Sequence, residues 1–148
     1  MIQKDIIEGN KLIAEFYGCI LRNMPVHISN GKSIWMSPTS SDGKTRTFFA
    51  YENELQFHSS WEWLMPVWIK IIELEENSTI KIDEICISKR SVFLRCYIWQ
   101  EDHGWVENHF YHDSINYNDG NELESKDLRQ ALYKTVLEFI KWYNTNRV

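Results

Sequence analysis

The sequence predicts an α+β fold in which an antiparallel β-meander has about three amphipathic helices packed on one face. Apolar residues recur at helical spacing near both ends and in the middle of the chain. They alternate with polar residues between positions 85 and 98, as in a half-buried strand. The chain has 148 residues with only six glycines and three prolines, so we expect one compact domain over residues 1–148.

Residues 3–17 are predicted to form the first helix. Four apolar side chains lie near one stripe: Ile6, Ile13, Phe16 and Tyr17. Gly18 is a suitable C-terminal stop, because glycine adopts the left-handed conformation that ends many helices. Gly9 lies inside the helix, where it costs about 1 kcal/mol relative to alanine.

Residues 19–58 are predicted to form two or three short strands or extended loops. Short apolar runs alternate there with the turn signals Asn30-Gly31, Pro38 and Asp42-Gly43. Asp42-Gly43 stands between Trp35-Met36 and residues 45–51, which makes it a plausible hairpin tip.

The stretch HSSWEWLMPVWIKIIELEE predicts the second helix. Ser59 stands three residues before Glu62, the spacing of a capping box. Pro66 predicts a kink, or a helix that begins nearer to Met65. Trp63 falls on the side opposite the apolar stripe, where it could be exposed at an interface or covered by a loop. The stripe consists of Trp61, Leu64, Met65, Trp68 and Ile72.

Two strands and a last helix are expected in the second half of the chain. The first strand has a bulge or an end at Asp83-Glu84, and a turn at 88–91 leads into the second. Ser125 is the expected cap of the last helix. The apolar face of that helix consists of Leu128, Leu132, Val136, Phe139 and Tyr143.

The stretch RCYIWQEDHGWVENHFYH, residues 95–112, predicts a β-hairpin with a loop at Asp102-His103-Gly104 and a left-handed Gly104. In the predicted register Glu101 faces Trp105, Trp99 faces Glu107, Tyr97 faces His109 and Arg95 faces Tyr111. One face is apolar and belongs to the core, with Leu94, Cys96, Ile98, Val106 and Phe110.

His109 and His112 resemble a metal-binding pair, but their odd spacing along a strand sends them to opposite faces. We therefore assign no metal ligand and no cofactor. Cys19, Cys86 and Cys96 form no CxxC pair, which argues against zinc-ribbon and thioredoxin-like sites.

The outward column of the hairpin is the candidate binding surface. It combines aromatic rings with one guanidinium and could stack on a planar ligand or on the side chains of a partner. Cross-strand pairing, or burial under residues 19–58, would explain the same residues. With Trp63, the candidate binding residues are Arg95, Tyr97, Trp99, Glu107, His109 and Tyr111.

Composition limits the function classes. The net charge of −5 argues against a nonspecific nucleic-acid binder, which needs a basic stripe. We see no signal peptide and no apolar run of about 20 residues, so we expect a cytoplasmic protein that does not enter a membrane. Three scattered cysteines suit a reducing compartment.

Three segments resemble a family of small uncharacterised proteins from phages and mobile elements of Bacteroidetes-type bacteria. They are NKLIAEFYG (10–18), SSWEWLMPVWIKI (59–71) and ALYKTVLEFIKWYN (131–144), about a quarter of the chain. The resemblance implies a small accessory protein of a bacterial cytoplasm that binds a host component, including components of antiviral defence. The family carries no assigned activity, so no site residue is transferred.

Three functions remain open. The first is a non-enzymatic binding protein that occludes a host protein, with self-association if Trp63 is exposed. The second is a protein that sequesters a nucleotide-like planar anion, with Arg95 serving the charge. The third is a hydrolase-type enzyme that uses Glu107 and His109, which share one face at i, i+2.

Overall fold

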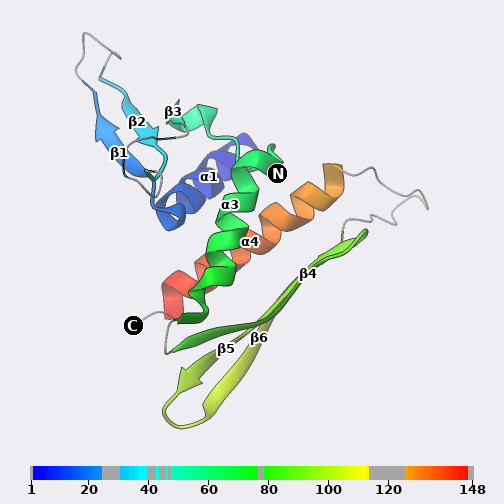
Figure 1. The fold of residues 1–148 in the computed structure, drawn as a ribbon. Helices are drawn as coiled ribbons and strands as arrows, with labels where there is room; N and C mark the ends of the chain where they lie inside the picture. Colours follow the sequence, from blue (N-terminus) through cyan, green and yellow to red (C-terminus); the bar gives the residue numbers. More distant parts are fainter. Residues whose placement is uncertain are drawn as a thin grey trace. The chain divides into compact units, whose positions relative to one another are not determined.

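The structure, a computed structural model, describes residues 2–24, 31–39, 43, 46, 48–76, 79–113 and 126–146. These residues contain three α-helices and two three-stranded antiparallel sheets, which confirms the α+β class (Figure 1). The chain divides into two compact units, Met1–Phe57 and His58–Val148, and each unit holds one of the sheets. The single domain expected from the chain length stays a prediction.

Helix α1, Gln3–Tyr17, opens the first unit and ends as the sequence predicts. Gly18 is left-handed, with φ 95°, and its N–H donates to the carbonyl oxygen of Glu15. Ile13 is fully buried, whereas the other three residues of the predicted stripe are half-buried. The buried Asn10 side chain ties the helix to its unit, because Nδ2 donates to the carbonyl oxygen of Leu55 at 2.8 Å.

The first sheet has the order β1-β2-β3, with β1 at Ile20–Asn23, β2 at Ser33–Met36 and β3 at Phe49–Tyr51. Strands β2 and β3 are antiparallel neighbours, so the predicted hairpin is confirmed. Gly43 lies in its connection with φ 73°, and Asp42 lies outside the described residues. The 3₁₀-helix Glu52–Glu54 follows β3.

Helix α3, Trp61–Ile72, opens the second unit. The predicted capping box is wrong, because Ser60 is the N-cap residue and Glu62 is therefore one position too early. Pro66 lies inside the helix, and the helix begins at Trp61 rather than near Met65. The buried face is shifted from the predicted stripe and consists of Leu64, Val67, Trp68 and Ile71.

The second sheet is an antiparallel meander of β4 (Ile80–Ile87), β5 (Ser91–Gln100) and β6 (Gly104–Asp113). A short 3₁₀-helix, Glu73–Glu76, joins α3 to this region. The register of β4 against β5 shifts between Ile82 and Glu84, which confirms the predicted bulge. Beyond β4, the Ser88 N–H donates to the Ser91 carbonyl oxygen at 2.9 Å and closes the turn.

Helix α4, Lys126–Asn146, packs on β5 and β6, while α3 contacts α4 and β4. Both helices lie on the same side of this sheet (Figure 1). Of the predicted apolar face, Leu132, Val136 and Phe139 are fully buried, and Leu128 and Tyr143 are half-buried. The expected cap, Ser125, lies outside the described residues.

Within the part of the chain that the structure describes, every helix is too short or too polar to cross a membrane.

Candidate functional site

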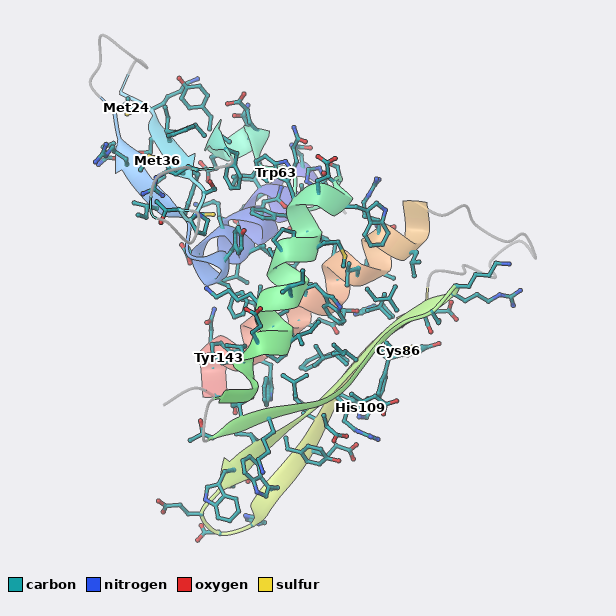
Figure 2. All side chains as sticks on the ribbon, viewed as in Figure 1. Met24, Met36, Trp63, Cys86, His109 and Tyr143 are labelled. Atoms are coloured by element: carbon teal, nitrogen blue, oxygen red, sulfur yellow. The ribbon has the colours of Figure 1, made fainter. Side chains whose placement is uncertain are left out.

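The face of the second sheet turned away from α3 and α4 is the candidate site, and we call it the aromatic face. Inward-pointing Leu94 and Cys96 are fully buried, and Phe110 packs edge-on against Phe139 of α4 at 6.0 Å. The residues between them point the other way, since side chains of a strand alternate. Figure 2 shows side chains leaving both faces of this sheet. The aromatic face includes Lys81, Asp83, Glu84, Phe93, Arg95, Tyr97, Trp99, Trp105, Glu107, His109 and Tyr111.

The register within the hairpin differs from the predicted one. Gly104 is left-handed as predicted, with φ 71°, but it pairs with Gln100 and therefore ends the loop instead of occupying it. Consequently Trp99 pairs with Trp105, Tyr97 with Glu107, Arg95 with His109, and Phe93 with Tyr111. Because the error is two residues, every side chain keeps its predicted face.

Three aromatic side chains of this face reach solvent. Trp99 is 48% exposed, Trp105 is 37% exposed and Tyr111 is 54% exposed. The two indole rings meet edge to face, with centroids 5.4 Å apart and an interplanar angle of 69°. Such a pair presents a broad apolar surface of fixed geometry.

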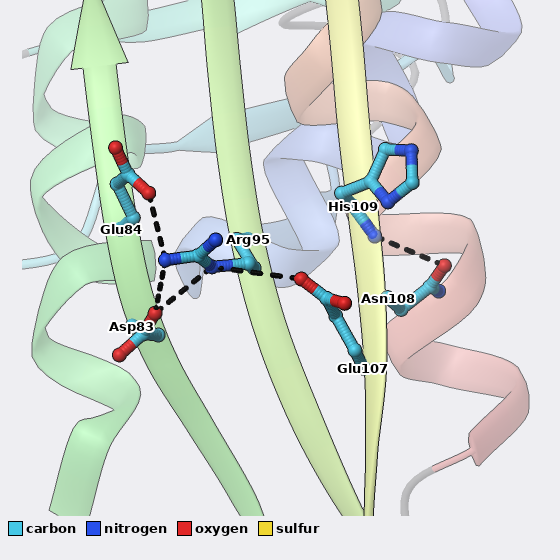
Figure 3. A network of polar contacts seen from close by, with 6 residues as sticks. All are labelled: Asp83, Glu84, Arg95, Glu107, Asn108 and His109. Carbon is cyan, nitrogen blue, oxygen red and sulfur yellow. Dashed lines mark hydrogen bonds and ion pairs between the residues drawn. The ribbon is translucent and has the colours of Figure 1, made fainter.

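Arg95 is the centre of a charge network (Figure 3). Its Nε and Nη2 atoms lie 2.9 and 2.8 Å from Asp83 Oδ2, and Nη2 lies 2.8 Å from Glu84 Oε2. Glu107 Oε1 lies 3.6 Å from Nε. The hydrogen bond to Asp83 and the neighbouring carboxylates raise the pKa of Arg95. Three carboxylates therefore surround one cation, and the network has a net negative charge.

A groove of about 520 Å³ lies beside this network. It is lined by Lys81, Ile82, Asp83, Tyr97 and Trp105. Lys81 lies directly across from Tyr97 in the sheet, and its Nζ is 4.2 Å from the centroid of the Trp105 ring. Lys81, Asp83 and Trp105 are not among the candidate binding residues predicted from the sequence. The alternation of Lys81 with the apolar Ile80 and Ile82 indicates that Lys81 faces solvent. It does not reveal which side chains of the neighbouring strands lie next to Lys81.

His109 and His112 lie on opposite faces of the hairpin, as predicted. His109 is exposed and its ring stacks on Phe93 at 6.2 Å. His112 points toward α4, where its Nε2 lies 2.8 Å from Glu138 Oε2. Among the described residues, no three His, Cys, Asp or Glu side chains lie close enough together to hold a metal ion.

Trp63 and the cysteines complete the candidates. Trp63 is half-buried on α3. It therefore matches neither of the two expectations in full, exposure at an interface or complete cover by a loop. Cys86 lies beside Phe93 and is exposed. Cys96 is in the core, and burial raises the pKa of its thiol to about 12. A buried neutral thiol is a poor nucleophile.

The first unit has a concavity of its own, of about 500 Å³. Lys11, Lys32 and Tyr51 are among its lining residues. The Lys11 ammonium lies 2.9 Å from Glu52 Oε1, and this hydrogen bond raises the pKa of Lys11. Lys32 Nζ lies 5.7 Å from the centroid of the Tyr51 ring. The sequence did not predict this concavity, because its lining residues come from α1, from all three strands of the first sheet with Lys32 just before β2, and from the 3₁₀-helix after β3.

Comparison of the chain with protein-family models, with curated proteins and with solved structures found no match. The resemblance to small phage-type proteins therefore stays a prediction.

Proposed function

We propose that this protein is a non-enzymatic binding protein that occludes a surface of a host protein through its aromatic face. The observation that carries the proposal is the exposure of Trp99, Trp105 and Tyr111 on a sheet whose other side packs on helices. Tryptophan and tyrosine are enriched at the centres of protein interfaces, where they fill pockets and exclude water.

The charges of the aromatic face favour a protein partner over a nucleotide-like anion. Arg95 was the residue expected to hold such an anion, and its guanidinium contacts Asp83, Glu84 and Glu107. A phosphate placed there would meet three carboxylates at close range, which is electrostatically unfavourable. An anion binder remains the second proposal, and the first unit supports it better than Arg95 does. The concavity brings the Lys11 and Lys32 ammonium groups to the Tyr51 ring, with one carboxylate, Glu52, paired to Lys11, whereas three carboxylates surround Arg95.

An enzymatic role for Glu107 and His109 has less support. The Glu107 carboxylate faces Arg95, and the His109 ring stacks on Phe93. Each side chain thus has its own neighbour, and these contacts do not aim both at one reacting atom, as acid–base catalysis requires.

We place this activity in a bacterial cytoplasm, as an accessory protein of phage type with a component of host defence among its targets. The resemblance of three helix-forming segments supports this context. The three cysteines without a CxxC motif fit a reducing compartment.

The test is a capture experiment with matched variants. Tagged protein is incubated with bacterial lysate, and retained proteins are quantified for the wild type and for a Trp99→Ser, Tyr111→Ser double variant. We expect a protein retained in near-stoichiometric amount by the wild type and reduced at least tenfold with the double variant, which corresponds to roughly 1.4 kcal/mol or more of binding free energy.

The control is Phe49→Ser in β3 of the first unit, where the ring is 66% exposed. It removes a comparable apolar side chain without touching the aromatic face, so the partner should be retained. Equal retention by all three proteins would show that binding does not use the aromatic face, and the proposal would then fail.

A further inference from the structure

The groove beside Trp105 has the composition of a cation-binding site. Tyr97 and Trp105 provide two aromatic walls, and Asp83 provides a carboxylate at the rim. Indole and phenol rings attract cations through the negative potential of their faces, and tryptophan does so most strongly. A neighbouring carboxylate adds a direct Coulomb attraction for the same ligand.

The protein already places one of its own cations in this groove. Lys81 Nζ stands 4.2 Å from the Trp105 ring centroid, well within the range of a cation–π contact. The side chain is exposed and belongs to β4, an edge strand of the described sheet. Lysine has a long flexible stem, so Lys81 can leave the groove without any change of the backbone.

The surroundings of the groove are acidic. Asp83, Glu84 and Glu107 lie around Arg95, and Glu101 and Asp102 form the exposed loop of the adjoining hairpin. Five carboxylates thus accompany two cations, Arg95 and Lys81. This potential attracts a basic surface and repels an acidic one.

We propose that this groove receives an arginine or lysine side chain of a partner protein, and that Lys81 holds its place in the free protein. The inference rests on the proposed function and names the chemistry of the partner surface. The incoming cation takes the position over the Trp105 ring and pairs with Asp83. A cation therefore lies beside the carboxylates of the groove both in the free protein and in the complex, so their negative charge is balanced in both states.

The test uses a blocked Arg-Gly-Arg peptide as the probe and the NMR signal of the Trp105 indole N–H as the readout, assigned with Trp105→Phe. Lys81→Ala removes the competing cation and should lower the dissociation constant of the peptide roughly fivefold. Lys134→Ala is the matched control, because Lys134 is an exposed lysine of α4 and its loss changes the net charge equally. Its effect should stay below about twofold.

A second variant tests whether the tighter binding of the peptide by Lys81→Ala depends on the Trp105 ring. Adding Trp105→Leu to Lys81→Ala should abolish the gain in peptide affinity. Because this variant lacks the Trp105 signal, its dissociation constant and that of Lys81→Ala are compared by isothermal titration calorimetry, and circular dichroism of each variant establishes that the unit is folded. Equal tightening by Lys81→Ala and Lys134→Ala would reduce the effect to net charge and overturn the inference. If Trp105→Leu also leaves lysate capture intact while Trp99 and Tyr111 remain essential, the groove proposal fails and the proposed function stands.

Discussion

The assignment of the two faces of the β4–β6 sheet can be tested by replacing Leu94 with alanine. Leu94 lies in the central strand, is fully buried, and points toward the helices. The substitution removes three carbon atoms from the core, which costs roughly 2.5 kcal/mol in transfer free energy. The cavity left behind adds to this cost, so we expect a loss of about 3 to 4 kcal/mol in the free energy of unfolding.

The assay is urea denaturation followed by far-ultraviolet circular dichroism, with the slope m compared between proteins. Tyr111→Ala is the matched substitution on the aromatic face and should cost less than about 1 kcal/mol, because the ring is 54% exposed. Leu94→Val removes one carbon atom and should cost about 1 kcal/mol, which keeps the comparison possible if the alanine variant does not fold.

The reverse order of costs would refute the reasoning. If Tyr111→Ala destabilised the protein more than Leu94→Ala, the ring would have to be buried in the folded protein. The aromatic face would then be part of a core, and the proposed binding surface would not exist.

Three further predictions concern thiols, alkaline pH and the hairpin loop. Cys86 should react with a thiol reagent in the folded protein, and Cys96 only after unfolding, which mass spectrometry of single-cysteine variants can measure. Burial raises the pKa values of Cys96 and Tyr133 to about 12, so the unfolded state loses these protons first as the pH rises. The free energy of unfolding should therefore fall from about pH 9 upward, by up to about 1.4 kcal/mol per pH unit for each group, and Cys96→Ala should flatten the decline between pH 9 and 10. Gly104→Ala should lower the free energy of unfolding by about 1 kcal/mol, because alanine is strained at a φ of 71°. The added Cβ would lie 3.8 Å from the nearest atom of Trp99, so it causes no clash. A loss above about 3 kcal/mol in urea denaturation would contradict this.

The periodicity of the sequence was sufficient to predict that the three helices form and which way the side chains of the β5–β6 hairpin point, but not which face of α3 is buried. Helix α1 ends at Gly18 because glycine adopts the left-handed conformation without a steric cost. The bulge at Asp83-Glu84 was visible as a break in alternation. The inward and outward columns of the hairpin followed from the two-residue period of a strand, so they survived the incorrect register.

The sequence alone could not supply the contacts between strands. A register error of two residues leaves the alternation unchanged, so the pairing of Trp99 with Trp105 became visible only in the folded hairpin. The partners of Arg95 come from β4 and β6, and the bulge sets which carboxylates reach it. No local pattern encodes such distances, because they depend on how three strands lie side by side.

What the sequence by itself determined is therefore that the helices and the meander form, and which residues of the hairpin face the core and which face solvent, since that choice follows from local periodicity and apolar burial. Tertiary structure alone decided that Lys81 lies over Trp105, that three carboxylates surround Arg95, and that the strands form two sheets in two units. The physical reason is that side-chain direction repeats along one strand, whereas a binding site is made by neighbours that are distant in the chain.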